Sequence, residues 1–188
     1  MNKTNILSSV AYLKPIIKDE NTIIEETLEV SYEDSPVQFI FNNDLTINFL
    51  YENDVGNYSY VQYRDLINYE LTDVQLKEQG IYNLYTLTDN QLLLHTYDYG
   101  CHALTLDGNF EASLIMLETL WDSSLKGYIT TNYAVAIPCR SVLLFCDADS
   151  TESLNEMKEL INQAWEERDH LLTKTIYIRT NNKWIISE

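Results

Sequence analysis

The stretch Leu106–Trp121, LDGNFEASLIMLETLW, is followed by a polar spacer and then by Tyr133–Cys146, YAVAIPCRSVLLFC, and these two segments are the most informative about the fold class. Neighbouring apolar residues in the first segment leave little of its surface polar, so a helix formed there has to be covered on most sides. The segment therefore predicts one central helix. The apolar residues that recur at helical spacing are Phe110, Leu114, Leu117 and Trp121.

The second segment holds two short, continuous apolar runs, Tyr133–Ile137 and Val142–Cys146. Such runs are typical of strands that are covered on both faces. Pro138–Ser141 between them predicts a tight turn that carries one charged residue, Arg140. A guanidinium flanked by buried strands needs a carboxylate or another anion. Two interpretations stay open: Arg140 binds a ligand, or it forms an internal ion pair that holds the turn.

Three further parts of the chain have the pattern of β-hairpins. Their strand-like arms enclose turn residues at Asn42–Asp44, around Gly100 and at Asn181–Asn182. Hairpins separated by helices indicate an α+β fold. We expect an antiparallel or mixed sheet built of hairpins and packed against about three to four helices.

Two helices are predicted beside the central one. Thr72–Gln75 has the spacing of a capping box and begins the first, which Gly80 interrupts or bends. Asp149, with Glu152 three residues later, caps the second. The second helix is expected to turn its apolar side inward, namely Leu154, Met157, Ile161, Ala164 and Trp165.

The first 35 residues predict an N-terminal extension. Thr4–Leu13 can form a short helix that Pro15 ends. Lys18–Asp34 follows as an acidic connector and is the best linker candidate in the chain. We therefore expect residues 1–35 to be a helix with a connector and residues 36–188 to be a single α+β domain, long enough to bury a core without disulfides.

The net charge of −17 comes from two acidic sectors. Ten carboxylates and no base lie between Lys18 and Arg64, and seven carboxylates and no base lie between Lys77 and Lys126. Such a field repels nucleic acid and anionic membranes and attracts basic proteins. We expect no nucleic-acid or membrane partner, and a basic protein partner if there is one. The alternative is that the charge serves solubility alone.

The three cysteines form no C-x-x-C pair, so neither a disulfide framework nor a zinc ribbon is indicated. No window approaches the roughly 18 apolar residues that a membrane span requires. The N-terminus also lacks the apolar stretch of a signal peptide. We therefore expect a cytoplasmic protein in a reducing compartment.

Few residues suggest chemistry. Cys139 beside Arg140 could be a thiolate nucleophile, but nothing in the sequence places a histidine next to it, and a small packed cysteine is the commoner role. The histidines near Gly100 match no established zinc spacing. Motifs for phosphate loops, dinucleotide binding, serine hydrolases and zinc peptidases are absent. We expect no metal and no cofactor; whether the chain is an enzyme stays open, with the balance against it.

Tyrosines crowd the edge of the first acidic sector. Tyrosine supplies large contact area at low entropic cost and is enriched in interfaces, so acids with tyrosines predict a docking face for a basic partner. The alternative is that the tyrosines simply populate strands. The candidate binding residues are Tyr51, Glu52, Asp54, Tyr58, Tyr60, Tyr63 and Arg140.

Four blocks of the sequence, within residues 36 to 187, resemble successive blocks of the DUF1444 family, a bacterial family of unknown function. The resemblance implies a cytosolic bacterial α+β protein and supplies no reaction. The blocks are SPVQFIFNNDLTINFLYEN, YVQYRDLINYELTDVQLKEQGIYNL, DGNFEASLIMLETLW and AVAIPCRSVLLF.

Single residues carry this resemblance. Asn83-Leu84 matches the end of a helix in the family pattern, with Gly80 or Ile81 where a small residue is expected. Ser141 stands where the family pattern has an acidic residue, which weakens any idea of an Arg/Asp catalytic pair. The residues that fit the expected helix start and turn are Gly108, Phe110, Ala112, Ser113, Pro138 and Arg140.

The sequence thus favours a non-enzymatic protein-binding module with an acidic, tyrosine-rich docking surface, such as an inhibitor or immunity protein for a basic toxin or nuclease. The alternative is a small intracellular hydrolase or transferase that uses Arg140 with a nearby carboxylate or Cys139. These groups would then have to converge in one pocket. A subunit of a larger assembly is a third hypothesis. The partner and the oligomeric state stay open.

Overall fold

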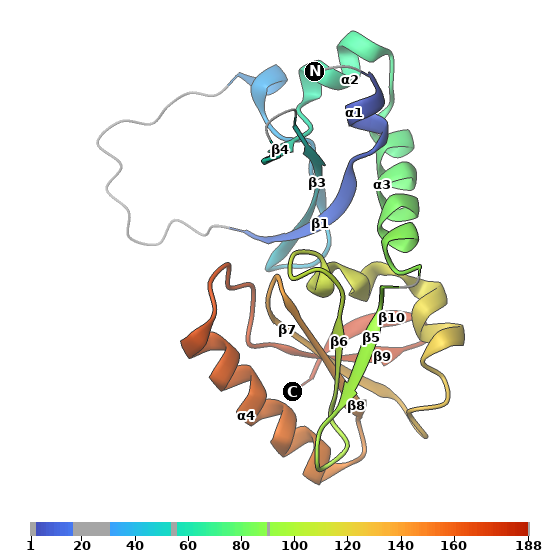
Figure 1. Cartoon of the computed structure of the whole chain (residues 1–188), viewed down its shortest axis with the longest axis vertical. Coiled ribbons are helices and arrows are strands. Elements are labelled where there is room, and N and C mark those ends of the chain that lie inside the picture. The colour runs from blue at the N-terminus through green and yellow to red at the C-terminus, as the bar shows by residue number, and fades with distance from the viewer. Residues whose placement is uncertain (1–2, 17–30, 54–55, 90, 188) are drawn as a thin grey trace. The chain divides into compact units, whose positions relative to one another are not determined.

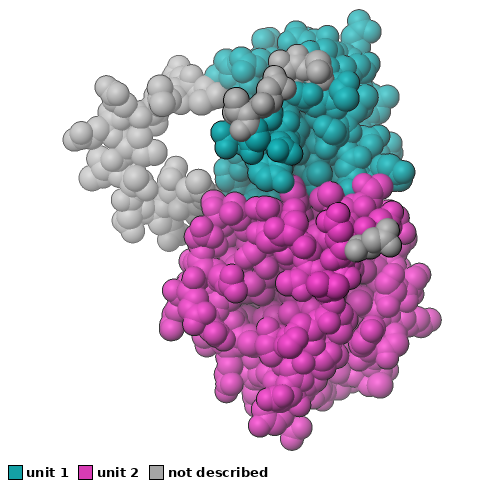
Figure 2. Space-filling view, viewed as in Figure 1, with its two compact units in different colours: residues 1–83 teal, residues 84–188 magenta. Residues whose placement is uncertain are grey.

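The computed structural model describes residues 3–16, 31–53, 56–89 and 91–187 (Figure 1). The chain divides into two compact units, residues 1–83 and 84–188, which Figure 2 colours separately. The division falls within one helix, α3 (Asp73–Leu87), whereas the sequence analysis expected a boundary after residue 35. Most of the expected acidic connector lies outside the described residues.

The first unit is built on an antiparallel sheet around β3 (Leu45–Glu52). β1 (Val10–Pro15) pairs with one side of β3, while the short strands β2 (Phe39–Ile40) and β4 (Tyr58–Tyr60) pair with its other side. Because β3 is central, it is buried from Leu45 to Tyr51 on both faces.

The hairpin expected around Asn42–Asp44 is confirmed. The Asn42 side-chain oxygen accepts hydrogen bonds from the backbone N–H groups of Asp44 and Leu45, each at 2.9 Å. A side chain that bonds its own following backbone in this way stabilises a turn without help from the rest of the fold.

The N-terminal helix expected over Thr4–Leu13 is wrong in its second half. The helix α1 covers only Lys3–Leu7, and the chain then continues as β1. Pairing with β3 buries Ala11 and Leu13 completely. A partner more than thirty residues away therefore overrides the helical spacing of this segment.

Two helices follow β4, namely α2 (Tyr63–Tyr69) and α3. The capping box at the start of α3 is confirmed: the Gln75 N–H donates to the Thr72 hydroxyl at 3.1 Å, and the Thr72 N–H donates to the Gln75 side chain at 2.9 Å. The predicted interruption at Gly80 is wrong, since α3 runs through it. Gly80 instead leaves room for the buried ring of Phe49, which would lie 2.6 Å from a Cβ atom at this position.

The second unit contains a six-stranded antiparallel sheet in the order β10-β9-β7-β8-β6-β5. Both remaining hairpins, β5–β6 and β9–β10, are confirmed. Asn181 and Asn182 form the turn of the last hairpin with φ angles of 51° and 60°, a region that asparagine tolerates better than most residues. The α+β prediction is therefore confirmed. The strands are β5 (Leu93–Thr96), β6 (His102–Thr105), β7 (Tyr133–Cys139), β8 (Val142–Asp147), β9 (Ile176–Thr180) and β10 (Lys183–Ile186).

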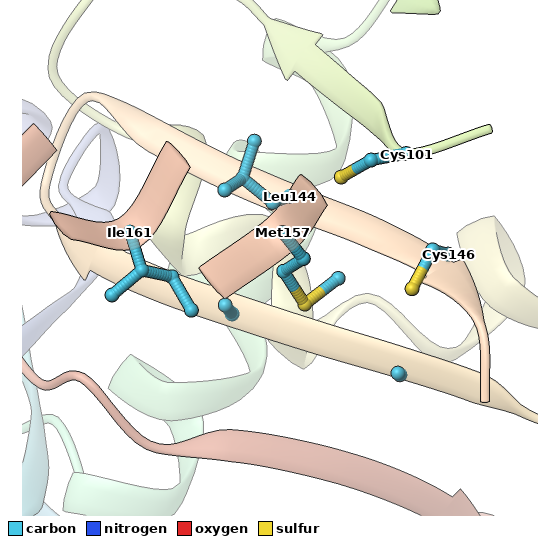
Figure 3. Close-up of a cluster of buried hydrophobic side chains, with 7 residues drawn as sticks. Cys101, Leu144, Cys146, Met157 and Ile161 are labelled. Carbon is cyan, nitrogen blue, oxygen red and sulfur yellow. The ribbon is translucent and has the colours of Figure 1, made fainter. Parts of the chain in front are cut away.

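Helix α4 (Thr151–Glu167) covers one face of this sheet. Figure 3 shows Met157 and Ile161 of α4 against Leu144 and Cys146 of β8. The opposite face of β8 packs against the Leu106–Trp121 segment, because the Phe145 ring lies 5.9 Å from that of Trp121. β7 and β8 are thus covered on both faces, as predicted.

The cap of α4 is Ser150 and not Asp149 as expected. The Ser150 hydroxyl accepts from the Ser153 N–H at 3.3 Å. Asp149 lies one residue before the cap and is exposed. Serine and aspartate are both good caps, so residue type alone does not choose between neighbours.

The central helix expected over Phe110–Trp121 is also wrong. This segment forms a 3-10 helix, η2 (Glu111–Met116), and a π-helical turn, η3 (Leu120–Ser124). Two indole N–H groups explain the break. Trp121 donates to the Leu114 carbonyl at 3.2 Å, which also accepts from the Leu117 N–H at 3.1 Å, and Trp184 donates to the Ile115 carbonyl at 3.1 Å, so side chains bond acceptors that a regular helix would use.

Within the described residues, β5 and β10 are the edge strands of the second sheet. Each exposes large apolar side chains: Leu93 on β5 is 68% exposed, and Ile185 and Ile186 on β10 are each 51% exposed. None of the described helices combines the length and the apolar character needed to cross a membrane.

Candidate functional site

The candidate binding residues fall into both units. Arg140 belongs to the second unit, and the five described residues between Tyr51 and Tyr63 belong to the first. Asp54 lies outside the described residues. The two groups are therefore considered as separate sites.

The tyrosines of the first unit do not form one surface. Tyr51 is buried, so its side chain is not available to a partner. Tyr58 is 48% exposed and lies opposite Glu52 in the β3–β4 pair, which makes these two a small exposed patch. The Tyr60 ring lies under the Lys14 ammonium, at 4.9 Å from its centroid.

Tyr63 belongs with a residue that the sequence analysis missed. Its ring stacks on that of Tyr32, with the centroids 4.3 Å apart, and Tyr32 is 68% exposed. Tyr32 begins a 3-10 turn, η1 (Tyr32–Asp34), in which the Ser31 hydroxyl accepts from the Asp34 N–H at 3.2 Å. The S-x-x-D spacing of Ser31 and Asp34 is the signal that could have placed this turn.

Two exposed acidic residues, Glu33 and Asp73, lie near Tyr32. Partial desolvation raises the pKa of the Tyr32 phenol, and Tyr63 and the Asp73 carboxylate raise it further. Glu33 lies next to Tyr32 in η1 and is exposed. We call these four residues, Tyr32, Glu33, Tyr63 and Asp73, the Tyr32 face.

The bases of the first unit that the structure describes already have internal contacts. Lys14 and Lys77 lie over aromatic rings, Arg64 pairs with Asp34 at 2.8 Å, and Lys3 donates to the Tyr69 carbonyl at 3.3 Å. Five exposed carboxylates have no ion pair with any described residue. They are Glu33, Glu52, Glu70, Asp73 and Glu78.

In the second unit, Arg140 and Ser141 form the turn between β7 and β8. The Arg140 N–H donates to the His170 carbonyl at 3.2 Å, and the Arg140 carbonyl accepts from the Ala112 N–H at 3.1 Å. The turn is therefore fastened on both sides by backbone hydrogen bonds. Its position does not depend on the guanidinium.

Arg140 is one of the residues that line a cleft of about 620 Å³. The expected internal ion pair is not formed with any described carboxylate, since no acidic oxygen lies within 4.0 Å of the guanidinium. The end of α4 also lines the cleft. The lining residues are Gly108, Arg140, Ser141, Glu166, Glu167, Arg168 and Asp169.

A buried carboxylate fixes the Gly108 wall of the cleft. Glu111 is 1% exposed, and one of its oxygens accepts from the N–H groups of Leu106 at 2.9 Å and Gly108 at 2.7 Å. Gly108 has a φ of +83°, which favours glycine. The loop at Gly108 and the β7–β8 turn are therefore both held by groups other than the charged side chains that line the cleft.

The cysteines do not take part in this cleft. Cys139 is fully buried, and its sulfur lies 3.5 Å from the Ser141 hydroxyl. Burial raises the pKa of the Cys101 thiol far above its ordinary value and that of Cys146 to about 12, so both stay protonated at neutral pH. Within the described ranges, no group of three or more histidine, cysteine or acidic side chains could hold a metal ion.

No protein-family model, no curated protein and no solved structure matches this chain. The likeness to the DUF1444 family stays a prediction.

Proposed function

We propose that the protein is a non-enzymatic binding module that engages a basic protein through the Tyr32 face. One observation carries the proposal: the described bases of the first unit have internal contacts, while exposed carboxylates around a stacked tyrosine pair have no ion pair with any described residue. Such a face attracts a cationic partner at long range. A basic toxin or nuclease, which the protein would inhibit, has the required charge.

The tyrosine pair provides the short-range part of the proposed interaction. Tyr32 is 68% exposed and already stacked on Tyr63, so a partner buries aromatic area without ordering a free side chain. Arginine also stacks on aromatic rings and pairs with carboxylates, which makes an arginine-bearing surface a good match.

The experiment is affinity capture from an extract of the source cell at low and at moderate salt, with wild-type protein and with Tyr32→Ser. A basic protein should be retained by the wild type, more weakly as salt increases. The Tyr32→Ser variant should bind it about tenfold or more weakly, because exposed aromatic anchors dominate such interfaces. The captured protein is then assayed for an activity that the wild-type chain suppresses.

Tyr82→Ser is the matched control. Tyr82 is 61% exposed on α3 and belongs to no described ring contact, so its loss should leave capture unchanged. Capture of nothing at low salt, or equal capture by Tyr32→Ser and the wild type, would refute the proposed face.

The Arg140 cleft supports a second candidate function, a small hydrolase or transferase. The observation in its favour is that Arg140 and the carboxylates of Glu166, Glu167 and Asp169 line one cleft. Cys139 is buried outside that lining, so the carboxylate version is the one proposed. A hydrolytic activity found with small ester or phosphoester substrates should be lost in Arg140→Ala while the melting temperature stays unchanged.

A further inference from the structure

The Arg140 cleft is lined by side chains of both charges, and this combination restricts the ligands that it can bind. Two guanidinium groups, Arg140 and Arg168, line it, and neither has an ion-pair partner among the described residues. Three carboxylates line it as well: Glu166, Glu167, which accepts from the Gln163 amide at 3.2 Å, and Asp169, which lies 3.7 Å from the His170 ring nitrogen. A simple anion would meet the arginines but also three negative charges. A simple cation would leave the arginines unpaired.

The end of α4 strengthens the demand for a cation. Glu166 and Glu167 occupy its last turn, which contains no basic residue. The C-terminal end of a helix carries a partial negative charge and is stabilised by a nearby cation. Arg168, the C-cap residue that follows, supplies one positive charge at this end, where two carboxylates precede it.

The β7–β8 turn provides the anion-binding side. The backbone of Arg140 is held by His170 and Ala112, so its guanidinium can turn to a ligand without loss of the turn. The Ser141 hydroxyl beside it can donate a further hydrogen bond. Arginine pairs with a carboxylate through two parallel hydrogen bonds, which gives orientation as well as affinity.

We propose that the Arg140 cleft binds a ligand that carries a carboxylate and, a few bonds away, a cationic amine: a free basic amino acid or the C-terminal residue of a basic peptide. Arg140, with Arg168 and Ser141, holds the carboxylate. Glu166, Glu167 and Asp169 hold the amine. The volume of about 620 Å³ lies in the range of small-molecule sites, roughly 300–1,000 Å³. This proposal rests on the second unit alone and does not depend on the Tyr32 face.

The test follows the backbone amide resonances of the isotope-labelled full chain during titration with three probes of equal chain length. ε-Aminocaproate carries both charges, hexylamine only the cation, and caproate only the carboxylate. We expect saturable shifts at Gly108, Ser141 and Asp169 with ε-aminocaproate, and binding at least about tenfold weaker for either single-charge probe. Free L-lysine and a glycine-glycine-lysine peptide then distinguish the amino acid from the peptide terminus.

Variants separate the cleft from the general acidity of the protein. Arg140→Ala should weaken ε-aminocaproate binding about tenfold or more, and Arg140→Lys should restore part of it. Lys158→Ala removes a positive charge from an exposed position of α4 outside the cleft and should change nothing. The proposal is overturned if hexylamine binds as well as ε-aminocaproate, if Arg140→Ala binds like the wild type, or if no probe gives saturable shifts.

Discussion

Gly80 lies in the middle of α3, and at this position a methyl group has no room. A Cβ atom there would lie 2.6 Å and 2.9 Å from two ring carbons of Phe49 and 3.3 Å from the Ala11 nitrogen. Glycine to alanine in an exposed helix stabilises by about 0.5–1 kcal/mol. Gly80→Ala should instead lower the free energy of unfolding by about 1–3 kcal/mol, the usual cost of overpacking. Urea unfolding at neutral pH measures the change.

Gly127→Ala is the control for this change. A Cβ atom at Gly127 would meet nothing within 4 Å. Its free energy of unfolding should stay within about 0.5 kcal/mol of the wild type. A Gly80→Ala protein that is more stable than the wild type would show that Phe49 does not pack against α3 at this position.

Asp147, at the end of β8, accepts several hydrogen bonds through its carboxylate. It accepts from both the backbone and the hydroxyl groups of Thr130 and Thr131, and from the Asp149 N–H at 3.1 Å. Burial alone would raise the pKa of Asp147, but these hydrogen bonds outweigh it and hold the pKa far below the ordinary range. Asp147→Asn should lower the free energy of unfolding by about 1–2 kcal/mol at pH 7.

The pH dependence of this loss follows from the sign of the shift. A carboxyl whose pKa is lowered by folding stabilises the protein above its unfolded pKa, near 3.9, and loses this effect as the pH falls toward its folded pKa. The difference between wild type and Asp147→Asn should therefore be constant from pH 7 to about pH 5 and shrink below about pH 4. A difference that grows on acidification would contradict the assignment. Asp149→Asn, which keeps the donating N–H, is the control.

Substitutions at the start of α4 can test which residue caps this helix. Ser150→Ala removes the hydroxyl that accepts from the Ser153 N–H and should cost about 1 kcal/mol. Asp149→Ala should cost only a few tenths of a kcal/mol, an interaction with the helix dipole. Thermal unfolding of the two variants compares them. A larger loss for Asp149→Ala would restore the cap predicted from the sequence.

The elements that the sequence predicted well are those with local causes. Each of these elements is held by hydrogen bonds or φ angles of residues next to one another in the sequence, so a short stretch of sequence is enough to predict it. They are Asn42, the Thr72–Gln75 box and the Asn181–Asn182 turn. β1 was missed because its partner β3 lies far along the chain. The break between η2 and η3 was missed because an indole from β10, Trp184, takes the Ile115 carbonyl.

The site residues also divide into those with a local signal in the sequence and those whose surroundings depend on distant segments. Arg140 was predicted in a turn from its apolar flanks, which are local. The Glu166–Asp169 side of its cleft comes from a helix end more than twenty residues later, and nothing in the sequence brings the two together. Tyr51 was expected to dock but is buried, because the alternation in β3 cannot reveal that a strand is covered on both faces.

For the whole molecule, the net charge of −17 predicts self-repulsion. The distance over which charges interact falls from about 30 Å at 0.01 M salt to about 8 Å at 0.15 M. Raising sodium chloride over this range should therefore raise the melting temperature by about 2–4 °C, the shift that 1 kcal/mol produces at this size. Potassium chloride should act equally. A falling melting temperature would mean that internal ion pairs outweigh the repulsion.

The edge strands of the second sheet, β5 and β10, indicate a further role for the net negative charge. Among the residues that the structure describes, β5 and β10 each have one edge that pairs with no strand, and both carry exposed large apolar side chains. Such edges pair with other copies when nothing keeps the copies apart. Mutual repulsion supplies that separation at neutral pH, and it vanishes near the isoelectric point of about 4.3. Light scattering during slow acidification should show reversible clouding around that pH. Ile185→Lys, which places a charge on the β10 edge, should reduce this clouding. The acidity of the chain would then also prevent the edge strands of its sheet from pairing with those of other copies.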